Sequence, residues 1–475
     1  MMAILSNAIF RIGVNSYRTA VTLFSKALAL IYVTAFVSFA VQARGLIGVQ
    51  GILPLNSFVD AVWGQLGASS FWRVPTVFWW LRSDNAIVGV CWACACIAFA
   101  AALARSGSFL QRGLFAVLYA GYVSVVSAGQ VFMGYQWDYL LLEAGFLAIF
   151  LTPDAARVWL FQWLLFRLMF ESGAVKMQSE DPTWRNLTAL TYHYYTQPLP
   201  TPLAWFFQQA PLAFQKLSTL AVLFAELILP WGFFGPRWLK LICAACTAAL
   251  QVVILLTGNY TFFNFLTIAF CLLLVDDRFF RNASPTAPRR ANRFVTAALF
   301  VFIMTLSCAG LADMFHVPVS PPISKMRHRF APFGVVNEYG LFANMTTSRI
   351  EITVEGSDDL QTWMPYVFRF KPDDPKHAPR WAAPYQPRLD WQMWFAALGN
   401  YQENPWFQHF AVRLMEASPP VLALLQSDPF HGRPPHYLRA TVSDFHYTDW
   451  IERRKTGDWW TRDDKGLYLP VVSLR

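Results

Sequence analysis

Charged residues are scarce in this chain: Asp, Glu, Lys and Arg form 14% of its 475 residues, and 55% of the residues are hydrophobic. An ordinary soluble domain has about 25% charged residues. The scarcity is confined to residues 1–324, which hold 20 basic and 12 acidic residues. The much shorter segment 325–475 holds 18 basic and 17 acidic residues. This composition excludes a disordered chain and a typical soluble enzyme, and it predicts a membrane domain at 1–324 and a soluble domain at 325–475.

Cysteine is absent after residue 308, so the soluble domain has no internal disulfide. The pairs Cys91/Cys94 and Cys243/Cys246 have CxxC spacing but lack His or acidic neighbours, which favours small buried thiols over a metal or redox site. The sequence also lacks HExxH, Walker, GxGxxG and GxSxG motifs, which argues against metalloproteases, ATPases, dinucleotide enzymes and hydrolases. We therefore predict no metal site and no cofactor.

Nine apolar runs predict an all-α polytopic membrane domain, because about 17–25 residues cross a ~30 Å hydrocarbon layer. The runs lie at 27–43, 85–104, 113–132, 138–152, 158–175, 217–235, 239–257, 260–275 and 294–312. The fourth and eighth runs are short, so the count of nine is approximate.

The distribution of basic residues predicts the orientation of these spans. With nine spans and a cytoplasmic N-terminus, 13 basic residues in or beside the loops fall on the cytoplasmic side and six on the opposite side. By the positive-inside rule, the N-terminus is cytoplasmic and the C-terminal domain is luminal or periplasmic. The net charge of +9 is thus a topology signal, and binding of nucleic acid is not expected.

Two long outward loops, at 44–84 and 176–216, are rich in aromatic residues and are expected to pack on the outer face. The first contains an apolar segment with helical potential that is expected to lie along the membrane interface. The C-terminal domain is expected to be α+β with a central sheet. In residues 349–370, β-branched and aromatic residues alternate with others on both sides of a Gly-Ser-Asp-Asp turn, which predicts two strands. Residues 436–450 predict a long strand, and helices are expected to begin at Trp391 and Pro405.

Ionisable side chains inside predicted spans are candidates for function, because their burial in the membrane is unfavourable. Arg167 and Glu171 are four residues apart on one helix face and can pair with each other. The predicted intramembrane polar cluster consists of Asp138, Glu143, Arg167, Glu171, Glu226, Asn259 and Asn264. The second outward loop adds the candidates Lys176, Trp184, His193, Tyr194 and Tyr195. The structural alternative is that these groups clamp neighbouring helices and satisfy one another.

Several long segments carry a family resemblance. They include FRLMFESGAVKMQSEDPTWRNLTALTYHYYTQPLPTPLAWF (166–206), LTGNYTFFNFLTIAFCLLLVDD (256–277), NEYGLFANM (337–345) and PYQPRLDWQMWFAAL (384–398). With these segments the chain resembles the lipase maturation factor family. The resemblance implies a multi-pass protein of the endoplasmic reticulum membrane in eukaryotes, or of the cytoplasmic membrane in bacteria, that helps secreted lipases or other exported clients to mature. It supplies no catalytic residues.

Two alternatives to this function remain open at the level of sequence. A lysine after a helix, followed by a tryptophan, is similar to the membrane domain of vitamin K-dependent γ-glutamyl carboxylase, which would make Lys176 a base supported by Glu171 and Arg167. A transporter would require inverted repeats, and the two halves show no self-similarity. Replacement of Lys176 by Ala separates the maturation function from catalysis, because only catalysis needs the amine.

As a maturation factor, the protein would have membrane lipids and an exported client as its partners. The client would be held by exposed aromatic residues of the C-terminal domain. The candidates are Trp363, Arg388, Asp390, Trp391, Trp394 and Trp406, with Trp459 and Trp460 as further aromatic anchors. The alternative is that these tryptophans form the core of that domain.

Overall fold

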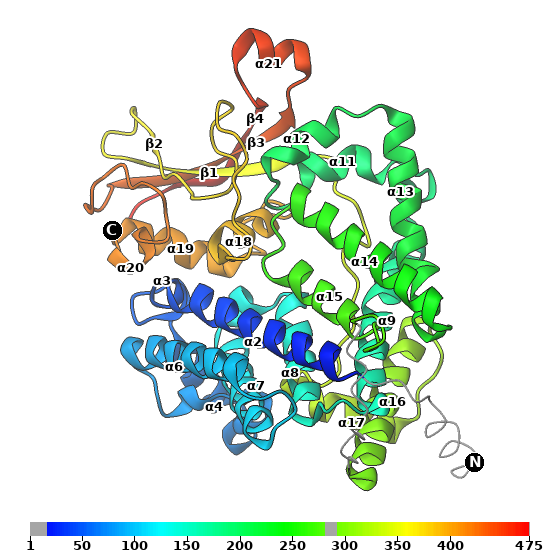
Figure 1. The fold of residues 1–475 in the computed structure, drawn as a ribbon. Coiled ribbons are helices and arrows are strands. Elements are labelled where there is room, and N and C mark those ends of the chain that lie inside the picture. The colour runs from blue at the N-terminus through cyan, green and yellow to red at the C-terminus, as the bar shows by residue number, and fades with distance from the viewer. Residues whose placement is uncertain (1–16, 281–291, 475) are drawn as a thin grey trace.

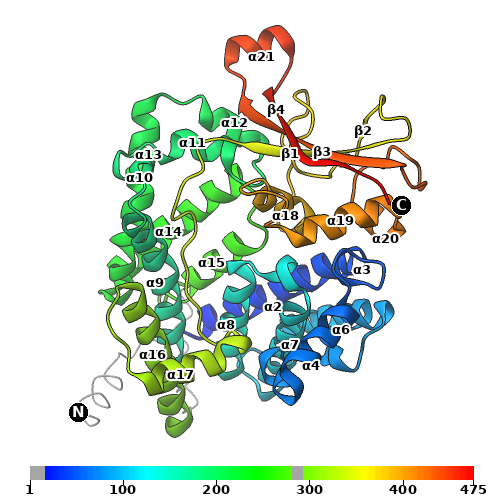
Figure 2. The ribbon, with the colours of Figure 1, turned by 180° about the vertical axis from the view of Figure 1, so that it is seen from behind.

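Residues 17–280 and 292–474 are described by a computed structural model, in which a helical body carries a four-stranded sheet and its helices at one end (Figures 1 and 2). The basic residues before residue 17 and within 281–291, which enter the charge count, lie outside the described residues. The expected fold class, a helical membrane part with an α+β C-terminal part, is confirmed.

Among the described residues, six helices are long and apolar enough to cross a membrane. They are α2 (Arg18–Ala40), α6 (Asp84–Leu103), α7 (Phe109–Ala128), α13 (Leu212–Leu227) continued by η4 (Leu229–Phe234), α14 (Arg237–Thr257) and α16 (Arg293–Met314). At about 1.5 Å per residue, 20 residues reach across the hydrocarbon layer. Serine side chains cap the N-termini of α6 and α7 and so fix where these helices begin. The Ser83 hydroxyl accepts from the Ala86 N–H, and the Ser108 hydroxyl accepts from the Gln111 N–H.

The other three expected spans are also helices, but a count of nine crossings is not confirmed. They are α8 (Gln136–Phe150), α9 (Ala155–Gln178) and α15 (Phe263–Leu272). Helices α8 and α15 have 15 and 10 residues, and most of their side chains are buried within the bundle. Helix α9 has 24 residues but carries four ionisable side chains, which lowers its hydropathy.

Both outward loops are largely helical. The first contains α3 (Ala43–Ile47), α4 (Leu55–Leu66), η1 (Gly67–Ser69), α5 (Ser70–Arg73) and η2 (Val77–Trp79). Trp63 and Trp80 in this segment are 48% and 73% exposed, as an interfacial segment requires. The second contains α10 (Pro182–Arg185), α11 (Ala189–Thr196) and α12 (Pro202–Gln208), and it packs against the C-terminal part through an edge-to-face contact of Trp205 with Trp450.

The sheet is antiparallel throughout, with strand order β2-β1-β3-β4. Its strands are β1 (Ile350–Ser357), β2 (Met364–Pro365), β3 (Tyr437–Tyr447) and β4 (Trp460–Val472). The expected second strand is much shorter than 349–370 suggested, because the Gln426 N–H donates to the Val367 carbonyl and draws the chain away from β1 after two residues. Ile352 and Val354 alternate inward on β1 and are fully buried.

The remaining helices join and cover these two parts. Helices α18 (Arg388–Ala396), α19 (Pro405–Met415) and α20 (Pro419–Leu422) lie between the sheet and the membrane helices (Figure 1). Helix α19 begins at Pro405, as expected from the preference of proline for the first helical turn. The other elements are η3 (Gln130–Met133), α17 (Pro321–Phe330), η5 (Ala331–Phe333) and α21 (Trp450–Thr456). Residues 334–349, here called the connecting segment, run from η5 to β1.

Candidate functional site

The connecting segment is held to α8 and α9 by buried polar contacts. Arg167 forms an ion pair with Glu143, and both side chains are essentially inaccessible. The Tyr339 hydroxyl and the Asn337 backbone N–H donate to Glu143 Oε2, at 2.8 and 3.0 Å. The expected ion pair between Arg167 and Glu171 does not form, because Glu171 instead accepts the backbone N–H of Tyr339 at 2.8 Å. These intramembrane groups therefore bind the connecting segment as well as one another.

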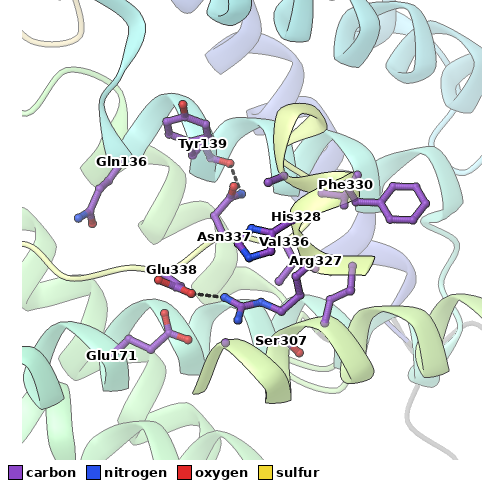
Figure 3. A pocket seen from close by; sticks show the side chains of 14 residues that line it. Gln136, Tyr139, Glu171, Ser307, Arg327, His328, Phe330, Val336, Asn337 and Glu338 are labelled. Carbon is purple, nitrogen blue, oxygen red and sulfur yellow. Dashed lines mark hydrogen bonds and ion pairs between the residues drawn. The ribbon is translucent and has the colours of Figure 1, made fainter. Parts of the chain in front are cut away.

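A cavity of about 360 Å³ lies beside these contacts (Figure 3). Its walls include Glu171 and Asn337, together with Arg327, which pairs with Glu338. Arg327 also pairs with Asp313. The charged groups around the cavity are thus mostly neutralised in pairs, which is the arrangement of a structural junction between α9, α16 and α17.

Lys176 is fully engaged at the end of α9. Its Nζ donates to the Ser172 and Leu341 carbonyls at 3.1 and 3.0 Å, and it pairs with Glu226 Oε2 at 2.8 Å. An ammonium group has three donors, so none remains for a substrate. The Trp184 ring lies 5.2 Å below the ammonium, and the Trp184 indole N–H donates to the Phe342 carbonyl. Nothing in this arrangement supports the carboxylase alternative, in which Lys176 acts as a free base.

The aromatic candidates of α11 are enclosed between the membrane helices and the C-terminal part. His193 Nε2 lies 3.4 Å from the Tyr260 hydroxyl, and its ring meets Phe342 edge to face. Burial lowers the pKa of His193 to about 4, so this imidazole is neutral near pH 7. Tyr194 is buried, and the Tyr195 hydroxyl donates to the Thr347 carbonyl at 2.8 Å. These residues therefore position the connecting segment.

Asp138 forms a second buried contact, with Arg388 of the C-terminal part. Both side chains are 0% exposed, and the two guanidinium nitrogens donate to the two carboxylate oxygens at 3.0 Å each. The Tyr122 hydroxyl also donates to Asp138, at 2.5 Å. Such bidentate geometry is the strongest form of the Arg–carboxylate contact.

Asn259 forms a third contact, and Asn264 does not take part. Asn259 donates to the Arg380 carbonyl at 2.8 Å and accepts from the Ala382 N–H at 2.7 Å. Asn264 donates to Gln251 within the membrane helices. The seven polar residues expected to form one cluster are therefore spread over separate contacts, most of which bind the C-terminal part or the connecting segment.

The C-terminal candidates differ in accessibility. Trp391, Trp406 and Asp390 are 3%, 5% and 2% exposed, and Trp460 is 1% exposed. Burial raises the pKa of Asp390 to about 6, although its carboxylate accepts the N–H groups of Phe370 and Lys371. These residues, with Arg388, support the fold in this conformation.

Trp363 and Trp394 are only partly buried. Trp363 stacks on the Arg439 guanidinium, and Trp394 donates to the Thr196 carbonyl at 2.8 Å. Trp459 is likewise partly buried. Contact of any of these residues with a client stays a prediction.

Several residues that bind the two parts together were not among the sequence candidates. Gln42 in the first span accepts the Arg388 N–H at 2.9 Å, and Ser38 accepts the Gln386 N–H at 3.0 Å. Arg349 donates to the carbonyls of Tyr195 and Pro198, at 2.7 and 2.9 Å. Ser38 and Gln42 lie four residues apart at the end of an apolar span, and this pattern is the signal that could have identified them.

Over residues 17–280 and 292–474, no group of three His, Cys, Asp or Glu side chains is placed to hold a metal ion. The fold and its buried contacts define a helical membrane protein whose folded C-terminal part is docked on one end of its membrane helices.

Comparison with known proteins identifies the family. The model of the lipase maturation factor transmembrane domain matches residues 19–282, and that of the lipase maturation factor C-terminal domain matches residues 335–470. The chain is 34% identical to lipase maturation factor 2 of Gallus gallus (95% of this chain, 81% of that protein) and 32% identical to lipase maturation factor 2 of Homo sapiens (95% and 82%). It is 31% identical to lipase maturation factor 1 of Bos taurus (94% and 88%). No solved structure gives a significant match. The chain belongs to the lipase maturation factor family.

Proposed function

We propose that this protein is a membrane-bound maturation factor that assists the folding or assembly of a secreted lipase or another exported client. The observation that carries the proposal is that both domains of the family match one chain and that relatives aligned over most of their length are named lipase maturation factors. The engaged state of Lys176 favours this function over membrane-embedded catalysis.

The proposed topology places the N-terminus in the cytoplasm and the C-terminal domain in the lumen or periplasm, with the domain boundary near residue 324. The membrane would be the endoplasmic reticulum in a eukaryote and the cytoplasmic membrane in a bacterium. This topology needs an odd number of crossings, so either one or all three of α8, α9 and α15 must cross together with the six apolar helices, and the nine predicted spans require all three. Burial of the ionisable groups of α9 supports such a crossing, because they face protein rather than lipid.

The proposed client contacts of the C-terminal domain are made by Trp363 and Trp394. These two candidates retain accessible ring surface, whereas Arg388, Asp390, Trp391 and Trp406 are occupied within the fold. Aromatic side chains that are partly exposed provide large contact area, as interfaces require.

The test is crosslinking through the C-terminal domain in native membranes, followed by identification of captured proteins. Trp363→Ala and Trp394→Ala are expected to lower client capture with little loss of stability, whereas Trp406→Ala lowers stability by about 3–5 kcal/mol as a core substitution. Lys176→Ala, compared at equal amounts of folded protein, should still capture the client. Absence of any exported client from the wild type, with a small molecule bound in a Lys176-dependent way, would contradict the proposal.

A further inference from the structure

An aromatic groove lies beneath α18, between the C-terminal part and the membrane helices. Its volume is about 480 Å³, within the range of small-molecule sites. Its walls include Trp137, Tyr260, Phe342, Trp391, Trp394 and Phe395, and no Asp, Glu, Lys, Arg or His side chain lines it. A site of this composition does not attract a charged ligand.

A second, smaller cavity of about 110 Å³ adjoins the groove and is here called the lateral cavity. It shares the walls formed by Tyr260, Leu341, Phe342 and Met345 with the groove. Its other walls come from α9, α10, α11, α13, α14 and α15, and its lysine and glutamate are paired with each other. These shared residues therefore separate the groove from the lateral cavity, which lies among the membrane helices.

The lateral cavity borders the outer surface of the helical bundle. Val253 of α14 lines it and is 40% exposed, and the neighbouring Val252 and Leu256 are also exposed. In a protein with membrane-spanning α13 and α14, these apolar side chains face lipid. One wall of the lateral cavity is therefore formed by a side chain that also faces lipid.

Some buried polar atoms at these sites have no hydrogen-bond partner within the described residues. Among them are the indole N–H of Trp391, a residue that is 3% exposed, and Nδ1 of His193. A buried indole N–H normally finds an acceptor. Trp391 lines the groove and His193 lines the lateral cavity. A ligand oxygen can accept the Trp391 N–H, so a ligand with oxygen acceptors on an otherwise apolar body matches the groove.

We propose that the groove and the lateral cavity together bind an uncharged acyl lipid from the bilayer. Its acyl chain lies in the lateral cavity, and its uncharged ester and hydroxyl oxygens lie in the groove, where the polar groups include the Trp391 indole N–H and the Gln136 and Asn344 amides. Phe342 stands between the two volumes, in contact with His193 and Tyr260, so its ring must move when the ligand spans both. This binding does not depend on the client or on its maturation.

The test uses the full chain in phosphatidylcholine nanodiscs that contain a diacylglycerol with a diazirine in one acyl chain. Irradiation should label the connecting segment near Phe342 and the α11 peptide near Tyr194, both of which line the lateral cavity. Gly134→Phe places a ring at the groove wall, where an added Cβ meets nothing nearer than the Val131 carbonyl oxygen at 3.8 Å. Labelling of both peptides should then fall about tenfold, which corresponds to about 1.4 kcal/mol of lost binding free energy.

Gly64→Phe is the matched control, because Gly64 faces open space outside the groove, and it should label like the wild type. Thermal unfolding of all three proteins, followed by tryptophan fluorescence, verifies that Gly134→Phe is folded. Unlabelled diacylglycerol should compete, and phosphatidic acid with the same chains should compete less. Equal labelling of Gly134→Phe and the wild type would overturn the proposal. Labelling confined to the outer faces of α13 and α14, or displaced by an aromatic peptide but not by diacylglycerol, would also overturn it.

Discussion

Loss of the Arg388 guanidinium should weaken the attachment of the C-terminal part to the membrane helices. Arg388→Met keeps the aliphatic bulk of the side chain but leaves the Asp138 carboxylate buried without its cation. Both groups are 0% exposed, so water cannot replace the lost partner. Removal of one member of a buried ion pair lowers stability by about 3–5 kcal/mol, and we expect a loss of that size.

The double variant Arg388→Met/Asp138→Leu separates the ion pair from general packing. Replacement of a whole buried pair by apolar residues is often close to neutral. Two losses remain. The Tyr122 hydroxyl no longer has its Asp138 acceptor, which costs about 1–3 kcal/mol, and the Phe132 carbonyl lacks its Arg388 donor in the single variant Arg388→Met as well. The double variant should therefore be no less stable than Arg388→Met alone, with a coupling free energy of about 2 kcal/mol or more.

The assay is equilibrium unfolding of the purified protein by SDS in mild detergent micelles, followed by tryptophan fluorescence. Arg185→Met is the matched control, because Arg185 pairs with Glu180 at 3.5 Å and the two side chains are 53% and 79% exposed. An exposed pair contributes about 0–1 kcal/mol. The reasoning is refuted if Arg388→Met is no more destabilising than Arg185→Met, or if the losses of the two single variants simply add.

Two further substitutions test other contacts of the site. Tyr339→Phe removes the hydroxyl that donates to Glu143 at 2.8 Å. The same SDS titration should show that the free energy of unfolding falls by about 1.5–3 kcal/mol, as for hydrogen bonds to charged groups. A fall no larger than that of Arg185→Met would contradict this role. Burial raises the pKa of Asp390 from 3.8 to about 6, so the folded protein binds this proton more tightly than the unfolded chain does. The contribution of Asp390 to stability therefore falls as pH rises from about 4 to about 6. Asp390→Asn keeps an oxygen acceptor for the Phe370 and Lys371 N–H groups. Its thermal midpoint, measured between about pH 4 and pH 6, should lack the pH dependence that Asp390 gives the wild type. An unchanged pH profile would show that Asp390 does not titrate in this range.

The sequence predicts the elements of this fold better than the contacts between them. Hydropathy and β-branched alternation are local signals, and they correctly place the membrane helices, strand β3 and the proline-started helix at Pro405. The second strand of 349–370 was overestimated, because pairing of Val367 with Ser427 depends on a distant segment.

The partners of the buried polar groups could not be predicted in the same way. Asp138 and Arg388 were both candidates, but for different roles, and they are 250 residues apart in the chain. Arg167 has a local candidate partner in Glu171, yet it pairs with Glu143 on another helix. Such pairings depend on how the helices and the connecting segment dock, and a periodic pattern along one helix carries no information about that docking.

The most direct test of the maturation function is complementation. Cells that lack their own lipase maturation factors would express a dimeric secreted lipase with this chain or with an empty vector, and the measured quantity is secreted lipase activity per amount of lipase protein. The maturation function predicts that the chain raises this specific activity and that Lys176→Ala, at equal amounts of folded protein, does so as well. A chain that is present in the membrane in folded form but leaves the specific activity at the level of the empty vector would contradict lipase maturation as its function.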